Sequence, residues 1–187
     1  MSETQKMNLW LIAEAAVASE RSKGCPAELQ AAQCILETGW LKHAPGNNCF
    51  GIKSYAGAYG RQLLQTREWF TDADAARFVA LGDGRTAKAG DPVQQDARGP
   101  TLYHAEDWFA TFATLGDCFV HRAAMFAAGR YAPFAAAFKA GGSLDELVRG
   151  IAPIYATDPG YADALLALIH RADVQAVITS ARAGVRP

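Results

Sequence analysis

Two glutamates in this sequence each lie beside a tryptophan where a predicted element ends. Glu37 closes an apolar helical run in CILETGW, and Glu68 lies in the strand-like stretch TREWF. Cleavage of a glycosidic bond needs one carboxyl group to protonate the leaving oxygen. It needs a second to activate water or to stabilise an oxocarbenium-like transition state. Glu37 and Glu68 supply two carboxyl groups, and their positions near tryptophans are compatible with that chemistry.

Glu37 suits the proton donor better than Glu68 does. A donor must stay protonated near neutral pH, which requires partial burial among apolar groups. A helix C-terminus also disfavours a negative charge, so it raises the proton affinity of a carboxyl group placed there. Taken alone, an exposed carboxylate at a helix end is the commoner case, and Glu68 alone is typical of a solvated edge strand. We expect the two to pair across a cleft.

Aromatic residues near these glutamates are candidates for stacking on sugar rings. For each one taken singly, ordinary packing in the core or at its rim is the alternative. The candidates are Trp40, Tyr55, Trp69 and Tyr155.

Hydrophobic periodicity predicts a mostly helical chain with one small β element. Helices are expected over residues 8–21 and from Pro26 to about residue 38, followed by a loop over 39–60. Residues 61–70 have the only convincing strand composition. Their period of two puts Leu64, Thr66 and Glu68 on one face and Arg67 and Trp69 on the other.

The second half of the chain predicts a surface insertion and then more helices. Residues 71–107 are rich in glycine, proline and charge, and are interpreted as an insertion with a short helix over 72–81. Further helices are expected after Thr114, with Cys118, Phe119, Arg122 and Phe126 on one face, and then at Pro133. Ser143 and Glu146 form a capping box, Asp158 caps a last helix, and residues 180–187 are expected to fray. The whole chain, 1–187, is interpreted as one domain.

Composition narrows the ligand classes. The 187 residues carry 18 basic and 19 acidic side chains, so no strong field toward nucleic acid or anionic membranes is expected. A neutral ligand such as a sugar fits this balance. No cofactor or metal is expected: a zinc site from Cys25, Cys34, His43 and Cys49 is the weaker alternative, because these residues lack familiar ligand spacing. Neither a signal peptide nor a membrane span is expected.

Four motifs, in order along the chain, resemble the glucosaminidase domain of glycoside hydrolase family 73. They are AAQCILETGW, GNNCFGIKSY, TREWF and YATDPGYADALLALI, and the resemblance covers about residues 8–175. That family includes bacterial autolysins, phage endolysins and the wall-cutting domain of the flagellar rod-cap protein. The sequence departs from the family at Leu41, where glycine is common, and at Cys49, where leucine is frequent.

The resemblance implies roles for single residues. Glu37 matches the catalytic acid, Glu68 the second acidic residue and Tyr155 a tyrosine that the family places near the scissile sugar. Asn47, Asn48 and Lys53 match the NNxFGIK segment, which shapes the cleft wall. Trp40, Asn48, Tyr55 and Trp69 are the expected substrate-binding residues. Thr157 and Asp158 are expected to hold the Tyr155 loop.

The implied fold is α+β and mostly α: a lysozyme-like helical domain with a small β-lobe. The implied reaction is hydrolysis of the β-1,4 bond between N-acetylglucosamine and N-acetylmuramic acid in peptidoglycan. A muramidase and a non-catalytic peptidoglycan-binding module are the alternatives. The expected partner is the glycan strand, bound by a monomer that is made in the cytoplasm and reaches the wall by release or dedicated export.

Overall fold

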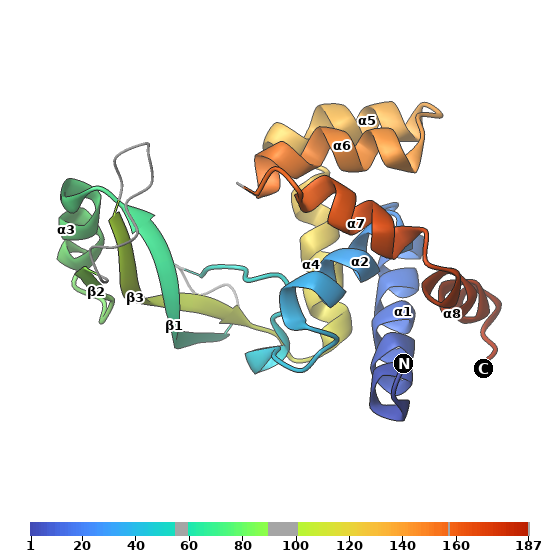
Figure 1. Cartoon of the computed structure of the whole chain (residues 1–187), viewed down its shortest axis with the longest axis horizontal. Helices are drawn as coiled ribbons and strands as arrows, with labels where there is room; N and C mark the ends of the chain where they lie inside the picture. The colour runs from blue at the N-terminus through green and yellow to red at the C-terminus, as the bar shows by residue number, and fades with distance from the viewer. Residues whose placement is uncertain (55–59, 90–100, 157, 187) are drawn as a thin grey trace. The chain divides into compact units, whose positions relative to one another are not determined.

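The computed structural model describes residues 1–54, 60–89, 101–156 and 158–186. The chain forms two compact units, and each is described by itself. The first joins Met1–Phe50 to Phe112–Pro187, and the second is Gly51–Thr111. The expected α+β class, mostly α, is confirmed: the first unit is helical and the second carries a small sheet (Figure 1).

Seven α-helices and two short 3-10 helices make up the described part of the helical unit. Their bounds are α1 Glu3–Lys23, α2 Ala27–Thr38, η1 Pro45–Asn47, α4 Leu115–Phe126, η2 Gly129–Tyr131, α5 Ala132–Lys139, α6 Leu144–Tyr155, α7 Tyr161–Ile169 and α8 Ala172–Ala183.

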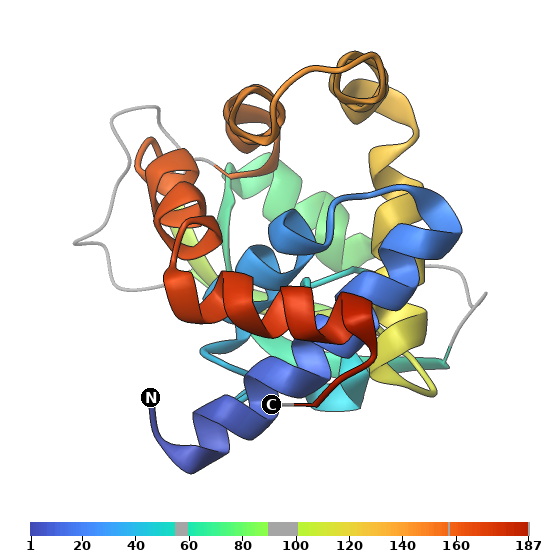
Figure 2. The ribbon, with the colours of Figure 1, turned by 90° about the vertical axis from the view of Figure 1, so that its right-hand side faces the viewer.

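Helix α1 is longer than its apolar periodicity predicts. It begins at Glu3 because Ser2 and Gln5 form a capping box, in which each side chain accepts a hydrogen bond from the other residue's backbone N–H. The apolar face that includes Leu9 and Ile12 is fully buried. Helix α8 crosses α1 in the view of Figure 2 and packs on it.

Helix α2 ends in an unusual left-handed turn. Gly39, Trp40 and Leu41 have φ values of +57°, +66° and +58° in succession. The Asn8 side chain donates to the Trp40 carbonyl at 2.7 Å, and Thr38 Oγ1 accepts from the Leu41 N–H at 2.8 Å. Residues with a Cβ rarely adopt a positive φ, so these two hydrogen bonds are needed to stabilise the turn. They fix the backbone conformation of the segment after Glu37.

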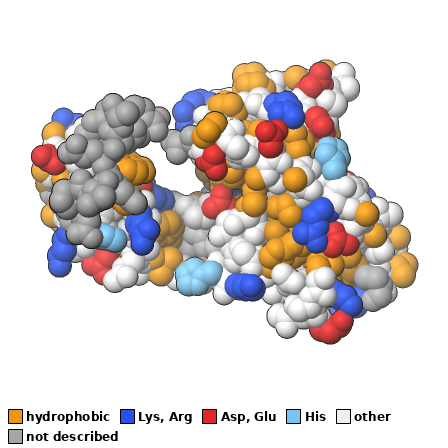
Figure 3. Space-filling view, viewed as in Figure 1, with side chains coloured by type: hydrophobic (Ala, Val, Ile, Leu, Met, Phe, Trp, Pro, Cys, Tyr) orange, Lys and Arg blue, Asp and Glu red, His pale blue; other side chains and the backbone are white. Residues whose placement is uncertain are grey.

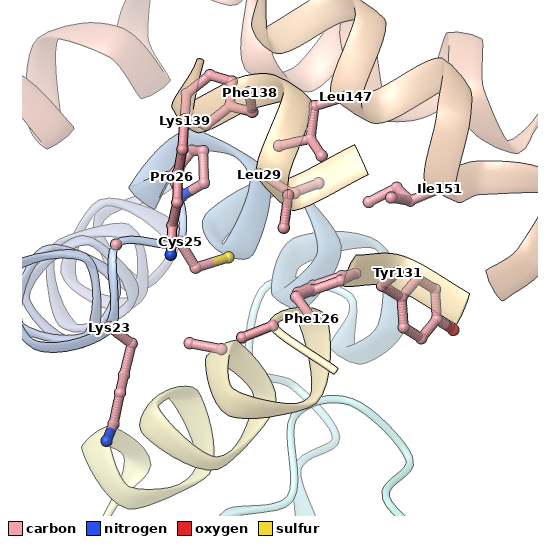
Figure 4. A pocket seen from close by; sticks show the side chains of 14 residues that line it. Lys23, Cys25, Pro26, Leu29, Phe126, Tyr131, Phe138, Lys139, Leu147 and Ile151 are labelled. Atoms are coloured by element: carbon pink, nitrogen blue, oxygen red, sulfur yellow. The ribbon is translucent and has the colours of Figure 1, made fainter. Parts of the chain in front are cut away.

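The helices enclose one apolar cluster that leaves a small pocket. Leu29 of α2 and Phe126 of α4 belong to it, with Val148 and Ile151 of α6. Figure 4 shows the pocket among α2, α4, α5 and α6, next to Cys25. Its volume of about 20 Å³ holds roughly one water molecule. No carboxylate lines it, so we interpret it as a packing gap rather than a site.

Predicted helix starts agree with the structure at two positions and differ at a third. Thr114 and Ser143 both cap their helices, as expected; the capping box expected at Ser143 is complete, and Thr114 also forms one with Asp117. Asp158 was expected to cap the last helix, and this is wrong. Gly160 precedes the first residue of α7, and the Asp158 carboxylate accepts the Gly160 N–H at 2.8 Å within the preceding turn.

The C-terminal segment also differs from expectation. A separate helix, α8, begins after Arg171 and runs to Ala183, so residues 180–183 are helical rather than frayed. Val174 and Ile178 anchor it because both side chains are fully buried.

The second unit is a three-stranded antiparallel sheet with one helix. The strands are β1 Gly60–Phe70, β2 Thr86–Ala89 and β3 Thr101–Thr111, in the order β1–β3–β2, and α3 spans Asp72–Ala80. Strand β1 and the short helix were expected. The expectation that residues 61–70 alone have strand character is wrong, because β3 is the central strand. Whether 71–107 is an insertion, and whether 1–187 is one domain, stay predictions.

The helical surface mixes charges of both signs with apolar groups (Figure 3). No single described helix is long and apolar enough to cross a membrane. The pair α7 and α8, bent by 60°, reaches that length and hydropathy only when the two are taken together. Both helices bury their apolar stripes in the core, through residues such as Leu165 and Ile178.

The left-handed turn yields a stability prediction. The free energy of unfolding of the Leu41→Gly variant should be about 1 kcal/mol higher than that of the Leu41→Ala variant. The reason is that glycine adopts a positive φ without strain, whereas alanine does not. The two variants lose the same Leu side chain, apart from one methyl group, so the alanine variant is the matched control. Urea unfolding followed by circular dichroism measures the difference. An alanine variant as stable as the glycine variant would contradict the strain.

Candidate active site

Glu37 lies in the last turn of α2 and faces two tyrosines. Its Oε1 accepts a long hydrogen bond, 3.4 Å, from Tyr161 Oη of α7. Tyr161 Oη in turn accepts from Gln33 Nε2 at 3.3 Å. Gln33 and Glu37 share a helix face because they are four residues apart. The buried Gln33 Oε1 has no hydrogen-bond partner in the described part of the chain.

Tyr155 completes this group from the end of α6. Its ring stacks on Tyr161 with the ring centroids 5.4 Å apart and an interplanar angle of 26°. Its Oη donates to the Phe50 carbonyl at 3.3 Å. Burial raises the pKa of both phenols well above the usual value for tyrosine, so both remain hydrogen-bond donors at neutral pH.

Burial also raises the pKa of the Glu37 carboxyl above its ordinary value of 4.5. Hydrogen bonds from Tyr155 and Tyr161 and the positive charge of Arg122 oppose this effect without cancelling it. The residue as a whole keeps an exposed side, whereas its carboxyl is surrounded by enough protein to lose much of its hydration. A carboxyl group that is both reachable and desolvated is what a proton donor requires.

Glu68 lies in the sheet unit, where a lysine and a threonine hold it. Lys53 Nζ forms an ion pair with Glu68 and another, at 2.8 Å, with Asp107, whose side chain is fully buried. Thr66 Oγ1 donates to Glu68 at 3.2 Å. Burial lowers the pKa of Lys53, but the two carboxylates outweigh it and raise that pKa overall. Lys53 therefore stays charged and fixes Glu68.

The NNCFGIK segment explains this placement. Asn47 adopts φ +58°, a region that asparagine tolerates, and its side chain donates to the Phe112 carbonyl at 2.9 Å. Beyond it, Ile52 and Ser54 pair with β3 through backbone hydrogen bonds of 2.9 Å to Ala110 and Trp108. This pairing brings Lys53 beside β3 and next to Asp107. Residues of this motif therefore stabilise the backbone in both units.

The expected substrate-binding residues lie in different surroundings. Trp40 is half-buried with the Arg171 guanidinium 5.0 Å from its ring centre. Asn48 is 6% exposed, and its Oδ1 accepts from the Phe50 N–H at 3.4 Å, which favours a structural role. Trp69 is 45% exposed on the sheet face opposite Glu68, as the alternation predicts. Tyr55 and Thr157 lie outside the described residues.

The structure therefore gathers Glu37 and Tyr155 and places Glu68 and Trp69 on opposite faces of one strand. Sequence reasoning missed Tyr161 and Gln33 as neighbours of Glu37. The signals were present: Gln33 precedes Glu37 by one helical turn, and Tyr161 is the second tyrosine of YATDPGY.

The alternative zinc site is not assembled. Within the described ranges, no three His, Cys, Asp or Glu side chains are close enough to hold a metal ion. Cys25, Cys34 and Cys49 are buried free thiols instead, as is Cys118.

The raised pKa of Glu37 predicts how Glu37→Gln changes stability with pH. A carboxyl with a raised folded-state pKa favours folding fully below its unfolded pKa, and this contribution is lost as pH rises through the folded value. The uncharged amide avoids that loss. Glu37→Gln should therefore be more stable than wild type at about pH 8, and the difference should vanish near pH 4. Thermal unfolding across this range measures it, and a constant difference would contradict the shift.

The Lys53 ion pairs predict a coupling in the sheet unit. Lys53→Met should lower the free energy of unfolding by about 1–3 kcal/mol, because two carboxylates lose their shared cation. Adding Glu68→Gln to Lys53→Met should recover part of that loss, since one uncompensated charge is removed. A double-mutant cycle by urea unfolding measures the coupling. Strictly additive effects would show that the pair contributes nothing.

Comparison with known proteins agrees with this fold. Three solved structures share it over most of their length, each with sequence identity too low to carry more than the fold. A peptidoglycan hydrolase mutant from Sphingomonas sp. A1 is 21% identical, with TM-score 0.63, over 93% of this chain and 98% of that one. The catalytic domain of the autolysin Auto from Listeria monocytogenes is 17% identical, with TM-score 0.66, over 95% and 89%. The glycoside hydrolase domain of Salmonella typhimurium FlgJ, truncated at its C-terminus, is 20% identical, with TM-score 0.58, over 88% and 95%.

The family assignment comes from the sequence. No curated protein matches the chain. The glucosaminidase family model, described as mannosyl-glycoprotein endo-beta-N-acetylglucosaminidase, matches residues 13–174. That match spans most of the chain and includes the Glu37, Glu68 and Tyr155 motifs. The chain is a member of the glucosaminidase family, glycoside hydrolase family 73.

Proposed function

We propose that this chain is an endo-β-N-acetylglucosaminidase of peptidoglycan, with Glu37 as its general acid. It hydrolyses the β-1,4 bond between N-acetylglucosamine and N-acetylmuramic acid. The observation that carries the proposal is the Glu37 carboxyl, whose pKa burial raises while the half-buried phenols of Tyr155 and Tyr161 face it. Family membership and the fold shared with peptidoglycan hydrolases support the choice of substrate.

In the proposed reaction, Glu37 donates its proton to the oxygen of the leaving sugar as the glycosidic bond breaks. The carboxylate that remains accepts a hydrogen bond from Tyr161, and the Tyr155 phenol lies beside it; burial keeps both phenols protonated. Tyr155 is proposed to orient the substrate's acetamido group or the attacking water.

Glu68 is the proposed second carboxylate. Lys53 and Thr66 bind it, so the direction of its side chain is defined before substrate arrives. A carboxylate held in this way is suited to activate water or to stabilise positive charge on the sugar ring.

The remaining proposed contacts differ in support. Trp69 offers an exposed ring for stacking on a glycan, although it does so from the face of β1 that Glu68 does not share. Trp40 is proposed as a contact at the end of α2, and Tyr55 keeps its proposed role from the motif alone. Asn48 keeps its proposed sugar contact from the motif alone, and its Oδ1 also accepts from the Phe50 N–H within the loop. Monomeric action and the route to the wall stay predictions.

The products of digestion test the proposal. Purified peptidoglycan is digested, the fragments are reduced with borohydride, and their ends are identified by mass spectrometry. We expect reduced N-acetylglucosamine ends from the wild type. Glu37→Gln should lower the rate by about 10²- to 10⁴-fold, because it removes the proton donor. Glu14→Gln, a change of the same type at an exposed position on α1, is the control and should keep full activity.

Other ends would assign the chain differently. Reduced muramic acid ends would make it a muramidase, and anhydro ends would make it a transglycosylase. Binding to the wall without any released fragment would leave the non-catalytic binding module as the function.

A further inference from the structure

Arg122 is a buried cation that forms no ion pair within the described ranges of the chain. It lies on α4 with 1% of its surface exposed, and it is among the largest fully buried side chains. Its Nε and Nη2 atoms have no hydrogen-bond partner in the described ranges of the chain. Burial of an arginine in this state is costly, because the guanidinium loses its water and gains no carboxylate. An apolar side chain would fill the same space without that cost.

Four aromatic rings surround the guanidinium instead. Its Cζ atom lies 3.9 Å from the ring centre of Phe126, 4.4 Å from Tyr155 and 5.8 Å from both Phe50 and Tyr131. These distances are within the range of cation–π attraction. We call this set the aromatic box. Its rings come from α4, η2, α6 and the NNCFG segment.

The aromatic box connects directly to the candidate active site. Tyr155 and Phe50 each contribute a ring to the box, and Tyr155 Oη donates a hydrogen bond to the Phe50 carbonyl. Tyr155 also stacks on Tyr161, which donates to Glu37. One buried cation therefore contacts both the NNCFG segment and Tyr155, and the Tyr155 ring stacks on the tyrosine that donates to the proposed acid.

We propose that Arg122 is a positioning residue of the active site. Its guanidinium holds the Tyr155 ring in place, and its positive charge favours the Glu37 carboxylate after the proton has left. This inference rests on the proposed function of Glu37.

The titratable groups around Glu37 and Arg122 are few and can be named by element. Tyr155 of α6 and Tyr161 of α7 face Glu37, and Gln33 lies beneath Tyr161 on α2. Around Arg122 are Tyr155, Tyr131, the neighbouring His121 and the thiols of Cys25 and Cys118. Among them Arg122 supplies the positive charge that opposes the effect of burial on Glu37, so its removal should raise the pKa of that carboxyl further.

Kinetics of Arg122→Met and Arg122→Lys test the proposal. Arg122→Met should reduce kcat by about tenfold while KM changes by less than about twofold, because the catalytic groups rather than the sugar contacts are disturbed. The basic limb of its kcat/KM profile should move to higher pH, since Glu37 then keeps its proton longer. Arg122→Lys keeps the charge and should return that limb toward the wild-type position.

Two controls separate positioning from folding and from the proposed function. Ile178→Ala removes a buried side chain of α8 outside the aromatic box, so it reports stability loss alone and should leave the pH profile unchanged. Ring ¹³C signals of labelled tyrosine, with Tyr155 assigned through Tyr155→Phe, should shift in Arg122→Met and not in Ile178→Ala. This readout needs no turnover.

The outcomes are distinct. If Arg122→Met keeps the wild-type kcat and pH profile, or leaves the Tyr155 ring signal unmoved, the positioning role is overturned. A wild-type protein that releases no fragments would refute the proposed function, while the ring signals would still report whether Arg122 holds Tyr155.

Discussion

Removal of water from one carboxyl group is the constraint on which the candidate site depends. Desolvation raises the pKa of Glu37, and every other nearby group acts in the opposite direction. Two phenols and a buried guanidinium favour the carboxylate, so the proton is held above the usual range for glutamate and can still be released. A site with burial alone would hold the proton too tightly, and a site with the donors alone would lose it too early.

The surrounding fold supplies these opposing effects from separate elements. Helix α2 carries Glu37, while the Tyr155 and Tyr161 rings reach it from α6 and α7 and stack on each other. The left-handed turn that starts at Gly39 ends the helix at Thr38, one residue after Glu37, and Leu41 adopts a positive φ there at an energetic cost. A second set of contacts, centred on Lys53, fixes Glu68 within the sheet unit.

Much of this arrangement could be predicted from local sequence. Helix periodicity, the N-cap at Thr114, the capping box at Ser143 and the alternation of β1 depend on residues close in the chain, and all agree with the structure. Strand β3 was missed because Glu106 and Asp107 interrupt its apolar pattern. The fully buried Asp107 is stabilised by Lys53, a partner that only the fold brings near. Arg122 was assigned correctly to the inner face of its helix, but the four rings around it come from distant segments.

The ionisation of Glu37 is the quantity that connects the fold to the proposed chemistry. It can be measured directly by following the carboxyl ¹³C signal of Glu37 against pH, with Glu37→Gln used to assign the signal. The account predicts a midpoint above the ordinary value of 4.5. A midpoint at or below that value would contradict it, because a carboxyl that is ionised throughout the neutral range cannot serve as the proton donor.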